Sequence, residues 1–195
     1  MKLVIIDYGA GNIQSIKFAF KRLGVEAELS SEIETIRNAD KVIFPGVGEA
    51  STAMNKLKGS GLNILIPELK QPVLGICLGM QLMCNSSEEG NTKGLGIFNV
   101  DVVKFDGTKK VPQIGWNKVE GLKSQLFSGL ENGFIYQVHS FYAPRIKETI
   151  ATCNYGITYS AALKKDNFYG TQFHPEKSGE YGAKILENFI SLKNE

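Results

Sequence analysis

Residues Gln71–Ser86, which read QPVLGICLGMQLMCNS, contain the strongest structural signal in the chain. The apolar run Gln71–Ile76 predicts a buried strand that breaks at Cys77, and Gly79–Ser86 predicts the helix behind it. A G-x-nucleophile-x-G pattern between a strand and a helix is typical of a nucleophile elbow, a strained turn in which side chains at the two glycines would clash. The helix N-terminus would favour a thiolate, and the Leu78 N–H is a natural donor to an oxyanion. The alternative interpretation is a buried structural cysteine between two packing glycines.

Strands and helices alternate in the first half of the chain around this segment. The predicted elements are strands over Lys2–Asp7, Val25–Leu29 and Lys41–Phe44, helices over Ile13–Leu23, Ser31–Asn38 and Glu49–Lys58, and turns over Tyr8–Asn12 and Pro45–Gly48. This order predicts an α/β fold with a mostly parallel, doubly wound sheet and helices on both of its faces.

The second half of the chain has a different pattern of short strands separated by turn residues. The predicted strands are Phe98–Phe105, Asn117–Glu120, Phe134–Val138, Thr149–Cys153, Ser160–Lys164 and Phe168–His174. They indicate an antiparallel or mixed extension of the sheet, and Gly179–Lys193 has the apolar spacing of a closing amphipathic helix. Since there is no repeat, low-complexity stretch or evident linker, we expect a single domain over residues 1–195.

Composition excludes several classes of function. Of 195 residues, 43% are hydrophobic and 22% are charged, and the formal net charge of +2 provides no electrostatic footprint for nucleic acid. No apolar run approaches the roughly 20 residues of a membrane span, and the N-terminal run is shorter than a signal peptide. The three cysteines are not clustered as metal ligands. We therefore expect a cytoplasmic protein that contacts neither membrane nor nucleic acid and uses no metal or other cofactor.

Two further segments supply groups that could act with Cys77. In Phe173-His174-Pro175-Glu176, an extended backbone would direct His174 and Glu176 to the same side. The imidazole could take the thiol proton and return it to a leaving group, and the carboxylate could orient the imidazole, although a lone His-Pro-Glu is more often a turn.

Pro45-Gly46-Val47-Gly48 follows a predicted parallel strand, where loops line the site in such sheets. Taken alone, it would be a plain strand-to-helix turn.

Together these motifs resemble the class I (triad) glutamine amidotransferases. The nucleophile motif is Gly75-Ile76-Cys77-Leu78-Gly79-Met80-Gln81, and the second triad motif is His174-Pro175-Glu176. Three other segments are similar to the glutaminase subunits, called HisH, of imidazole glycerol phosphate synthases: Asp7-Tyr8-Gly9-Ala10-Gly11-Asn12, Pro45-Gly46-Val47-Gly48 and Ile114-Gly115-Trp116-Asn117. The resemblance covers essentially the whole chain and implies a flavodoxin-like fold.

The resemblance implies a role for each matching residue. Cys77 would form a glutamyl thioester, His174 would be the acid and base, and Glu176 would orient it. The implied oxyanion donors are the N–H groups of Val47 and Leu78. The implied glutamine-binding residues are Gly46, Gly48, Gln81, His139, Ser140 and Phe141, and the implied partner-interface residues are Trp116, Asn117 and Lys177.

In this family the partner is a (β/α)8-barrel cyclase that forms a heterodimer with the glutaminase. Ammonia released from L-glutamine enters the barrel, which makes imidazole glycerol phosphate and an aminoimidazole carboxamide ribotide (AICAR) in histidine biosynthesis. One departure concerns this partner, because Gln113 follows Pro112 where the family usually has histidine. An alternative is therefore a paralogous glutaminase that supplies ammonia to a sugar- or cell-surface-amidating enzyme. A non-catalytic module and a stand-alone cysteine peptidase of similar fold fit less well, since the triad residues and Gln81 are all present.

Overall fold

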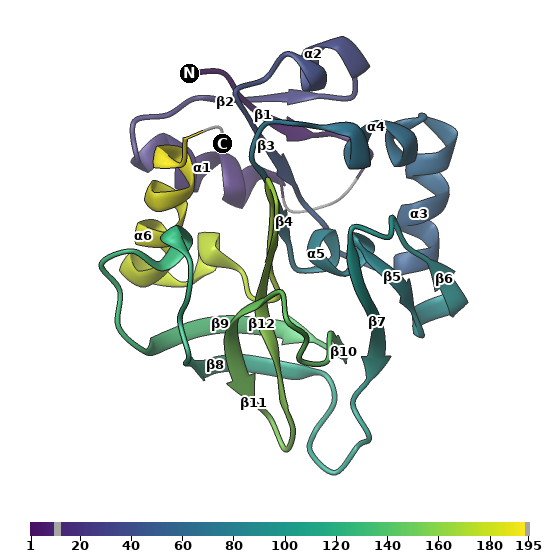
Figure 1. Cartoon of the computed structure of the whole chain (residues 1–195), viewed down its shortest axis with the longest axis vertical. Coiled ribbons are helices and arrows are strands. Elements are labelled where there is room, and N and C mark those ends of the chain that lie inside the picture. The colour runs from purple at the N-terminus through teal and green to yellow at the C-terminus, as the bar shows by residue number, and fades with distance from the viewer. Residues whose placement is uncertain (10–12, 194–195) are drawn as a thin grey trace.

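A seven-stranded sheet forms the centre of the molecule (Figure 1) in a computed structural model that describes residues 1–9 and 13–193. Its strand order is β11-β12-β13-β4-β3-β1-β2. The strands are β1 (Leu3–Ile6), β2 (Ala27–Ser30), β3 (Lys41–Phe44), β4 (Val73–Ile76), β11 (Thr149–Asn154), β12 (Thr158–Lys165) and β13 (Phe168–Thr171). The five strands from β13 to β2 are parallel, whereas β11 and β12 are antiparallel to their neighbours. The predicted parallel sheet with an antiparallel extension is therefore confirmed.

Helices cover both faces of this sheet, as the alternating sequence pattern predicts (Figure 1). They are α1 (Ile13–Arg22), α2 (Ile33–Arg37), α3 (Ala50–Gly59), α4 (Leu62–Glu68), α5 (Leu78–Leu82) and α6 (Gly179–Ser191). Successive residues of β1 enter different cores: Ile5 packs with Phe20 of α1 and Phe189 of α6, whereas Val4 packs with Leu57 of α3. Burial on both faces explains why the inner parallel strands β1 and β4 are continuously apolar, whereas the edge strand β2 is not.

Two smaller sheets stand beside the central sheet. One has the order β10-β7-β5-β6, and the other pairs β8 with β9. Their strands are β5 (Cys84–Ser87), β6 (Thr92–Lys93), β7 (Phe98–Lys104), β8 (Gln113–Val119), β9 (Gly133–His139) and β10 (Phe141–Tyr142). The predicted strands Phe98–Phe105, Asn117–Glu120 and Phe134–Val138 therefore lie mainly in separate sheets. Glu120 forms an antiparallel bridge to Thr152 of β11, the edge strand of the central sheet. The choice of partner strand depends on contacts that local sequence does not encode.

Three local predictions were wrong. The helix predicted over Gly79–Ser86 ends at Leu82, because the chain turns back into β5, which pairs with β6 and β7. Helix α4 was missed, and it contains Pro67. The strand predicted to reach His174 ends at Thr171, and Pro175–Lys177 forms a short 3₁₀ helix, η3. The predicted glycine-rich turn at 10–12 lies outside the described residues.

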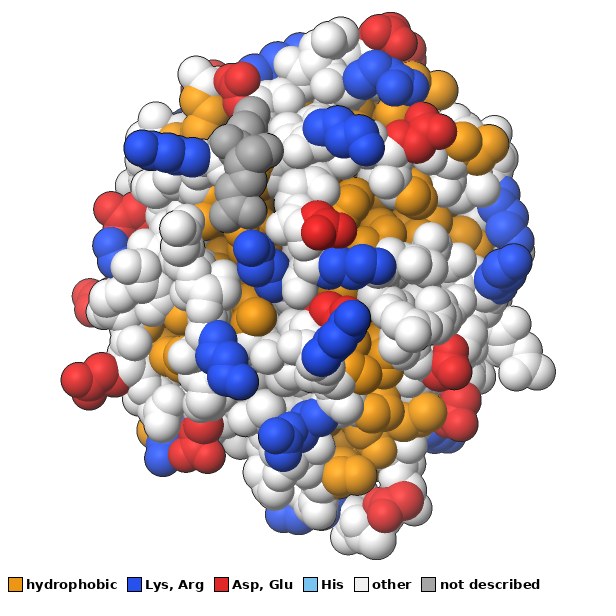
Figure 2. All heavy atoms as spheres, in the orientation of Figure 1, with side chains coloured by type: hydrophobic (Ala, Val, Ile, Leu, Met, Phe, Trp, Pro, Cys, Tyr) orange, Lys and Arg blue, Asp and Glu red, His pale blue; other side chains and the backbone are white. Residues whose placement is uncertain are grey.

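Two observations concern the apolar character of the helices and the charge on the surface. In the described part of the chain, no helix has both the length and the apolar character needed to cross a bilayer. Figure 2 shows basic and acidic side chains on the same face of the molecule, with apolar side chains between them. This mixture agrees with the near-zero net charge of the sequence.

Candidate active site

Cys77 lies at the carboxyl end of β4 on a strained turn. Its φ of 53° and ψ of −110° are outside the usual regions for a residue with a side chain. A Cβ atom on Gly79 would lie 2.0 Å from the Phe44 carbonyl oxygen, and one on Gly75 would lie 2.8 Å from the Met80 nitrogen. Both glycines are therefore required by close backbone packing, as the elbow interpretation predicts. The strained turn places Cys77 at the N-terminus of α5, where the thiol is directed into a cavity.

His174 and Glu176 form a buried pair, with 2.8 Å between Nδ1 of the imidazole and Oε1 of the carboxylate. The expected contact is present, but the expected reason for it is wrong: Glu176 lies in η3 and not on an extended strand. Pro175 begins this turn, and the tight turn brings the two side chains together. The second carboxylate oxygen, Oε2, is buried and has no hydrogen-bond partner among the described residues.

The environment of His174 favours its protonated form. Burial disfavours the imidazolium, but hydrogen bonds and charge interactions with Cys77 and Glu176 outweigh burial and raise the pKa of His174 to about 10. The ring is therefore held between a sulfur atom and a carboxylate. That is the arrangement in which an imidazolium can stabilise a thiolate.

Strand β9 fixes the backbone of His174. The His174 N–H donates to the Tyr136 carbonyl oxygen at 3.0 Å. The Ser178 hydroxyl bridges the two residues from the other side, accepting from the Tyr136 N–H at 2.9 Å and donating to the His174 carbonyl oxygen at 2.7 Å. The position of the candidate base therefore depends on the β8–β9 pair.

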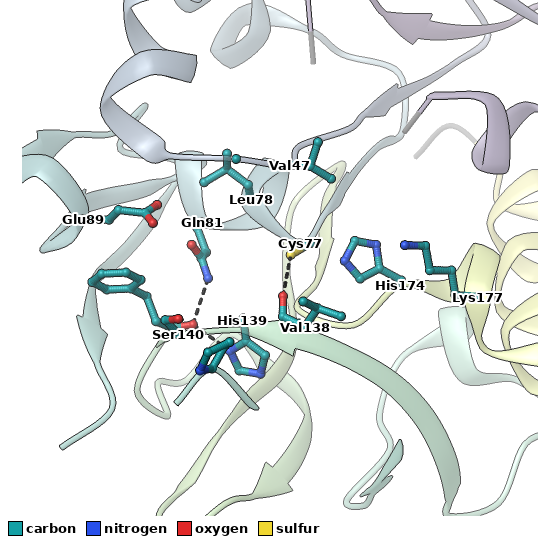
Figure 3. Close-up of a pocket in the computed structure, with 13 residues that line it drawn as sticks. Val47, Cys77, Leu78, Gln81, Glu89, Val138, His139, Ser140, His174 and Lys177 are labelled. Atoms are coloured by element: carbon teal, nitrogen blue, oxygen red, sulfur yellow. Dashed lines mark hydrogen bonds between the residues drawn. The ribbon is translucent and has the colours of Figure 1, made fainter. Parts of the chain in front are cut away.

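A cavity of about 430 Å³ opens over Cys77, as Figure 3 shows. Its size is that of a small-molecule site. It brings together ten of the predicted site residues, namely Val47, Gly48, Cys77, Leu78, Gln81, His139, Ser140, Phe141, His174 and Lys177. Three residues in its lining were not predicted: Glu89, Pro112 and Val138.

Gln81 and His139 hold one wall of the cavity by a shared acceptor. The Phe141 carbonyl oxygen accepts from Gln81 Nε2 at 2.9 Å and lies 2.7 Å from His139 Nδ1. Gln81 Nε2 also donates to Gln172 Oε1 at 2.9 Å. Burial lowers the pKa of His139 to about 4, so this imidazole is neutral at physiological pH and unsuited to be the base.

The segment Pro45–Gly48 forms another wall beside Cys77. Val47 and Gly48 line the cavity, and Gly48 has a φ of +94°, a conformation that favours glycine. Gly46 was predicted to bind substrate but lies behind the elbow, where a Cβ would be 2.4 Å from the Gly79 nitrogen. Its lack of a side chain is therefore explained by packing against α5. The Tyr8 hydroxyl donates to the Pro45 carbonyl oxygen at 2.8 Å and anchors the start of the segment.

Glu89 is the clearest functional candidate that the sequence interpretation missed. It begins the short helix η1 (Glu89–Asn91), and its Oε2 accepts from the Ala50 N–H at 2.8 Å. Burial raises the pKa of this carboxyl group, and its side chain lines the same cavity as Gln81 (Figure 3). No local motif marks Glu89, because only the reversal of the chain through β5 returns it to the elbow.

The predicted interface residues occupy different environments. Trp116 is 58% exposed on β8 and stands beside Ile114 (61%) and Phe134 (60%), which together form what we call the outer patch. Asn117 instead donates to the Asn154 carbonyl oxygen at 3.0 Å. Lys177 lines the cavity next to His174 (Figure 3).

The chemistry available at this site is that of covalent acyl transfer. A cysteine at a helix N-terminus, a histidine able to carry its proton and a buried carboxylate are the parts of a nucleophile–base–orienter triad. Over residues 1–9 and 13–193, no group of three or more histidine, cysteine or acidic side chains is arranged to hold a metal ion.

The chain is similar to known glutamine amidotransferases over almost its whole length. Residues 4–192 match the family model "Glutamine amidotransferase class-I". Two curated relatives carry the name imidazole glycerol phosphate synthase subunit HisH: that of Bacteroides fragilis (strain YCH46) is 58% identical, and that of Escherichia coli (strain K12) is 47% identical. Each comparison covers 98% of this chain and 100% of the relative.

Solved structures resemble the chain at lower identity. A crystal structure of a glutamine amidotransferase superposes with a TM-score of 0.76 at 19% identity and covers 96% of this chain and 97% of its own. A glutamine amidotransferase from Thermotoga maritima superposes with a TM-score of 0.66 at 16% identity, covering 98% of this chain and 83% of its own. At these identities the likeness shows the fold alone.

Proposed function

Because the chain belongs to the class I glutamine amidotransferase family, in which its curated relatives are HisH subunits, we propose that it hydrolyses L-glutamine through Cys77, His174 and Glu176. The observation that carries this assignment is the His174–Glu176 contact of 2.8 Å, because His174 lines the same cavity as the Cys77 thiol at the elbow. Cys77 also interacts with His174 closely enough to help raise the pKa of the imidazole, and such a pairing is what activates a cysteine nucleophile.

The reaction proceeds through a thioester. The Cys77 sulfur attacks the side-chain amide carbon of glutamine, and the carbonyl oxygen becomes an oxyanion that the N–H groups of Val47 and Leu78 stabilise. His174 donates its proton to the amide nitrogen, the carbon–nitrogen bond breaks and ammonia leaves. A water molecule then attacks the thioester with His174 as base, which releases glutamate and regenerates the thiol.

The amino-acid end of glutamine occupies the opposite end of the cavity. Its ammonium group needs acceptors, and the Glu89 carboxylate is directed there beside Gln81. The wall formed by His139, Ser140 and Phe141 contacts the same end of the substrate. Lodging both ends of the molecule would place the side-chain amide over Cys77.

A separate synthase chain receives the ammonia. Since the relatives are named as subunits of imidazole glycerol phosphate synthase, we infer a heterodimer with a (β/α)8-barrel cyclase that makes imidazole glycerol phosphate and AICAR in the cytoplasm. The outer patch supports a partner on this side, because its three large apolar side chains are exposed on the β8–β9 pair, which also carries the cavity residues Val138 and His139. Gln113 has a buried side chain, so its departure from the family pattern does not change that exposed surface.

Replacing the nucleophile tests the chemistry. Cys77→Ser should reduce glutamine hydrolysis by more than roughly a thousandfold, because a hydroxyl is far less nucleophilic than a thiolate, while circular dichroism stays unchanged. Cys84→Ser and Cys153→Ser are matched controls, since both cysteines are buried away from the cavity lining. A glutamine-analogue electrophile should label Cys77 alone in a mass-spectrometric digest. Labelling of Cys84 or Cys153 with an active Cys77→Ser variant would overturn the assignment.

The partner proposal requires a separate measurement. We expect the chain alone to hydrolyse glutamine slowly and the cyclase barrel with its nucleotide ligand to accelerate the hydrolysis. The reason is that the peptide planes between the two glycines can rotate, so that the Val47 N–H no longer points toward the oxyanion. A missing oxyanion donor costs about a hundred- to a thousandfold in turnover. The test of this activation is the rate of glutamine hydrolysis by the chain alone, with the barrel, and with the barrel and its ligand. Full activity of the chain alone contradicts the gating, and activation only by a sugar-amidating enzyme favours that acceptor.

A further inference from the structure

A buried hydrogen-bond chain behind the cavity centres on Tyr159, a residue of β12 that is fully inaccessible to solvent. Its hydroxyl accepts from Gln137 Nε2 at 2.8 Å, can donate to Gln113 Oε1 at 3.0 Å and lies 3.3 Å from His139 Nε2. Its ring contacts the His139 ring edge-on, with 5.4 Å between the centroids. A polar atom in so buried a place must have a structural or functional reason.

The acceptor on the other side of His139 determines which ring nitrogen carries the proton. The Phe141 carbonyl oxygen can only accept, so His139 Nδ1, 2.7 Å away, must be the donor. With the neutral ring, Nε2 is then an unprotonated acceptor buried in the core. Among the described residues, the Tyr159 hydroxyl lies within hydrogen-bond distance of this nitrogen and can donate to it.

We propose that Tyr159 is a positioning residue for glutamine binding, which acts by donating to His139 Nε2 and thereby holding the His139–Phe141 wall of the cavity. This inference rests on the proposed glutaminase function. The hydroxyl does not touch the reacting atoms. It fixes the imidazole, the imidazole fixes the Phe141 carbonyl, and that carbonyl also fixes Gln81.

Gln113 has a different role in this series of buried hydrogen bonds. The Tyr159 hydroxyl has a single proton, and both Gln113 Oε1 and His139 Nε2 are within reach of it. Removing the amide at 113 leaves His139 as the acceptor, so the contact that holds the wall survives. Removing the hydroxyl at 159 leaves His139 Nε2 buried without that donor. The unmade buried hydrogen bond then destabilises the position of His139 and Phe141 in the cavity wall.

The test compares two ways of alkylating Cys77 in the full chain. A glutamine-analogue electrophile must engage the wall to react, whereas iodoacetamide needs only the thiol. Tyr159→Phe should lower the second-order rate of labelling by the glutamine analogue roughly tenfold and leave the iodoacetamide rate at Cys77 within about twofold. Gln113→Leu should leave both rates within about twofold of the unmodified chain.

The matched control is Tyr142→Phe, which removes a hydroxyl from the same aromatic cluster, since the rings of both tyrosines contact Phe105. It should leave both rates unchanged. Because the chain has only two histidines, ¹⁵N-histidine NMR offers a direct readout: Tyr159→Phe should shift the Nε2 resonance of His139 and leave that of His174 in place.

The outcomes separate this inference from the proposed function. If the unmodified chain is not labelled at Cys77 by the glutamine analogue, the glutaminase assignment fails. If it is labelled and Tyr159→Phe reacts as fast, the positioning role is overturned. Equal losses in Tyr159→Phe and Gln113→Leu, or parallel losses with both reagents, also overturn it, because they would reflect general disruption of the core.

Discussion

A single methyl group on Gly79 should destabilise the fold modestly and disable the chemistry of the elbow. In Gly79→Ala the new Cβ would lie 2.0 Å from the Phe44 carbonyl oxygen and 3.3 Å from the Pro45 carbonyl carbon. The first contact falls about 1.4 Å short of ordinary van der Waals distance, which begins at 3.4 Å. Both neighbours are backbone atoms at the end of β3, so no flexible side chain can move aside. The first turn of α5 must separate from the segment that begins at Pro45.

Two magnitudes follow from that separation. Overpacking of this kind typically costs about 1–3 kcal/mol of unfolding free energy. The displaced segment contains Val47, a proposed oxyanion donor, and loss of one donor lowers turnover by about a hundred- to a thousandfold. We therefore expect activity to fall much more than the loss of stability explains.

Urea unfolding and glutamine-analogue labelling of Cys77 measure the two effects on the same samples. Gly59→Ala is the matched control, because Gly59 ends α3 and a Cβ there would have nothing within 4 Å. Alanine at this helical position should stabilise the chain by about 0.5–1 kcal/mol and leave labelling unchanged. If Gly79→Ala unfolds within about 0.5 kcal/mol of the unmodified chain and reacts at the same rate, the glycine is not constrained as its contacts indicate.

Three further predictions concern the charged groups of the site. Glu176→Gln should retain more glutamine hydrolysis than His174→Ala in the same buffer, since the carboxylate orients the base whereas the base transfers the proton; the reverse order would mean that the roles are misassigned. The pKa of His174 is raised from 6.5 to about 10, so its contribution to stability is present below about pH 6.5 and is lost as the pH rises to about 10; an NMR titration midpoint below 7 would contradict this. Glu89→Gln should raise the KM for glutamine roughly tenfold and change kcat little, because an amide cannot pair with the substrate ammonium, whereas Glu88→Gln should leave both constants unchanged. Equal effects of Glu89→Gln on kcat and on KM in steady-state assays would argue against a binding role.

The sequence was sufficient where local backbone geometry determines the structure. The alternation of strands and helices predicted the central sheet, and the spacing of Gly75 and Gly79 predicted the strained turn at Cys77. The His174–Glu176 contact was predicted from strand geometry, but a short 3₁₀ turn produces it. In that case the chemistry of the residues was a better guide than the backbone conformation assigned to them.

The sequence was insufficient where contacts between distant segments determine the structure. Met83 to Ser86 continues a helical pattern, yet pairing of β5 with β7 ends the helix at Leu82. Glu89 reaches the cavity because of that same pairing, so no spacing rule could identify it. Gly46 has the local signature of a ligand-binding loop, but its contact with Gly79 gives it a packing role that only the folded chain reveals.

The backbone hydrogen bond from His174 to Tyr136 has a consequence for protein engineering. Tyr136 faces Trp116 across the β8–β9 pair, with the two rings 6.1 Å apart, so the outer patch and the base share one short ladder of strands. We expect that substitutions selected only for tighter binding of the proposed partner at this ladder also move the imidazole relative to the thiol. We therefore expect affinity for the proposed partner and turnover of glutamine to be linked. In libraries of variants at positions 114, 116 and 134, gains in one should come with losses in the other unless both are selected together.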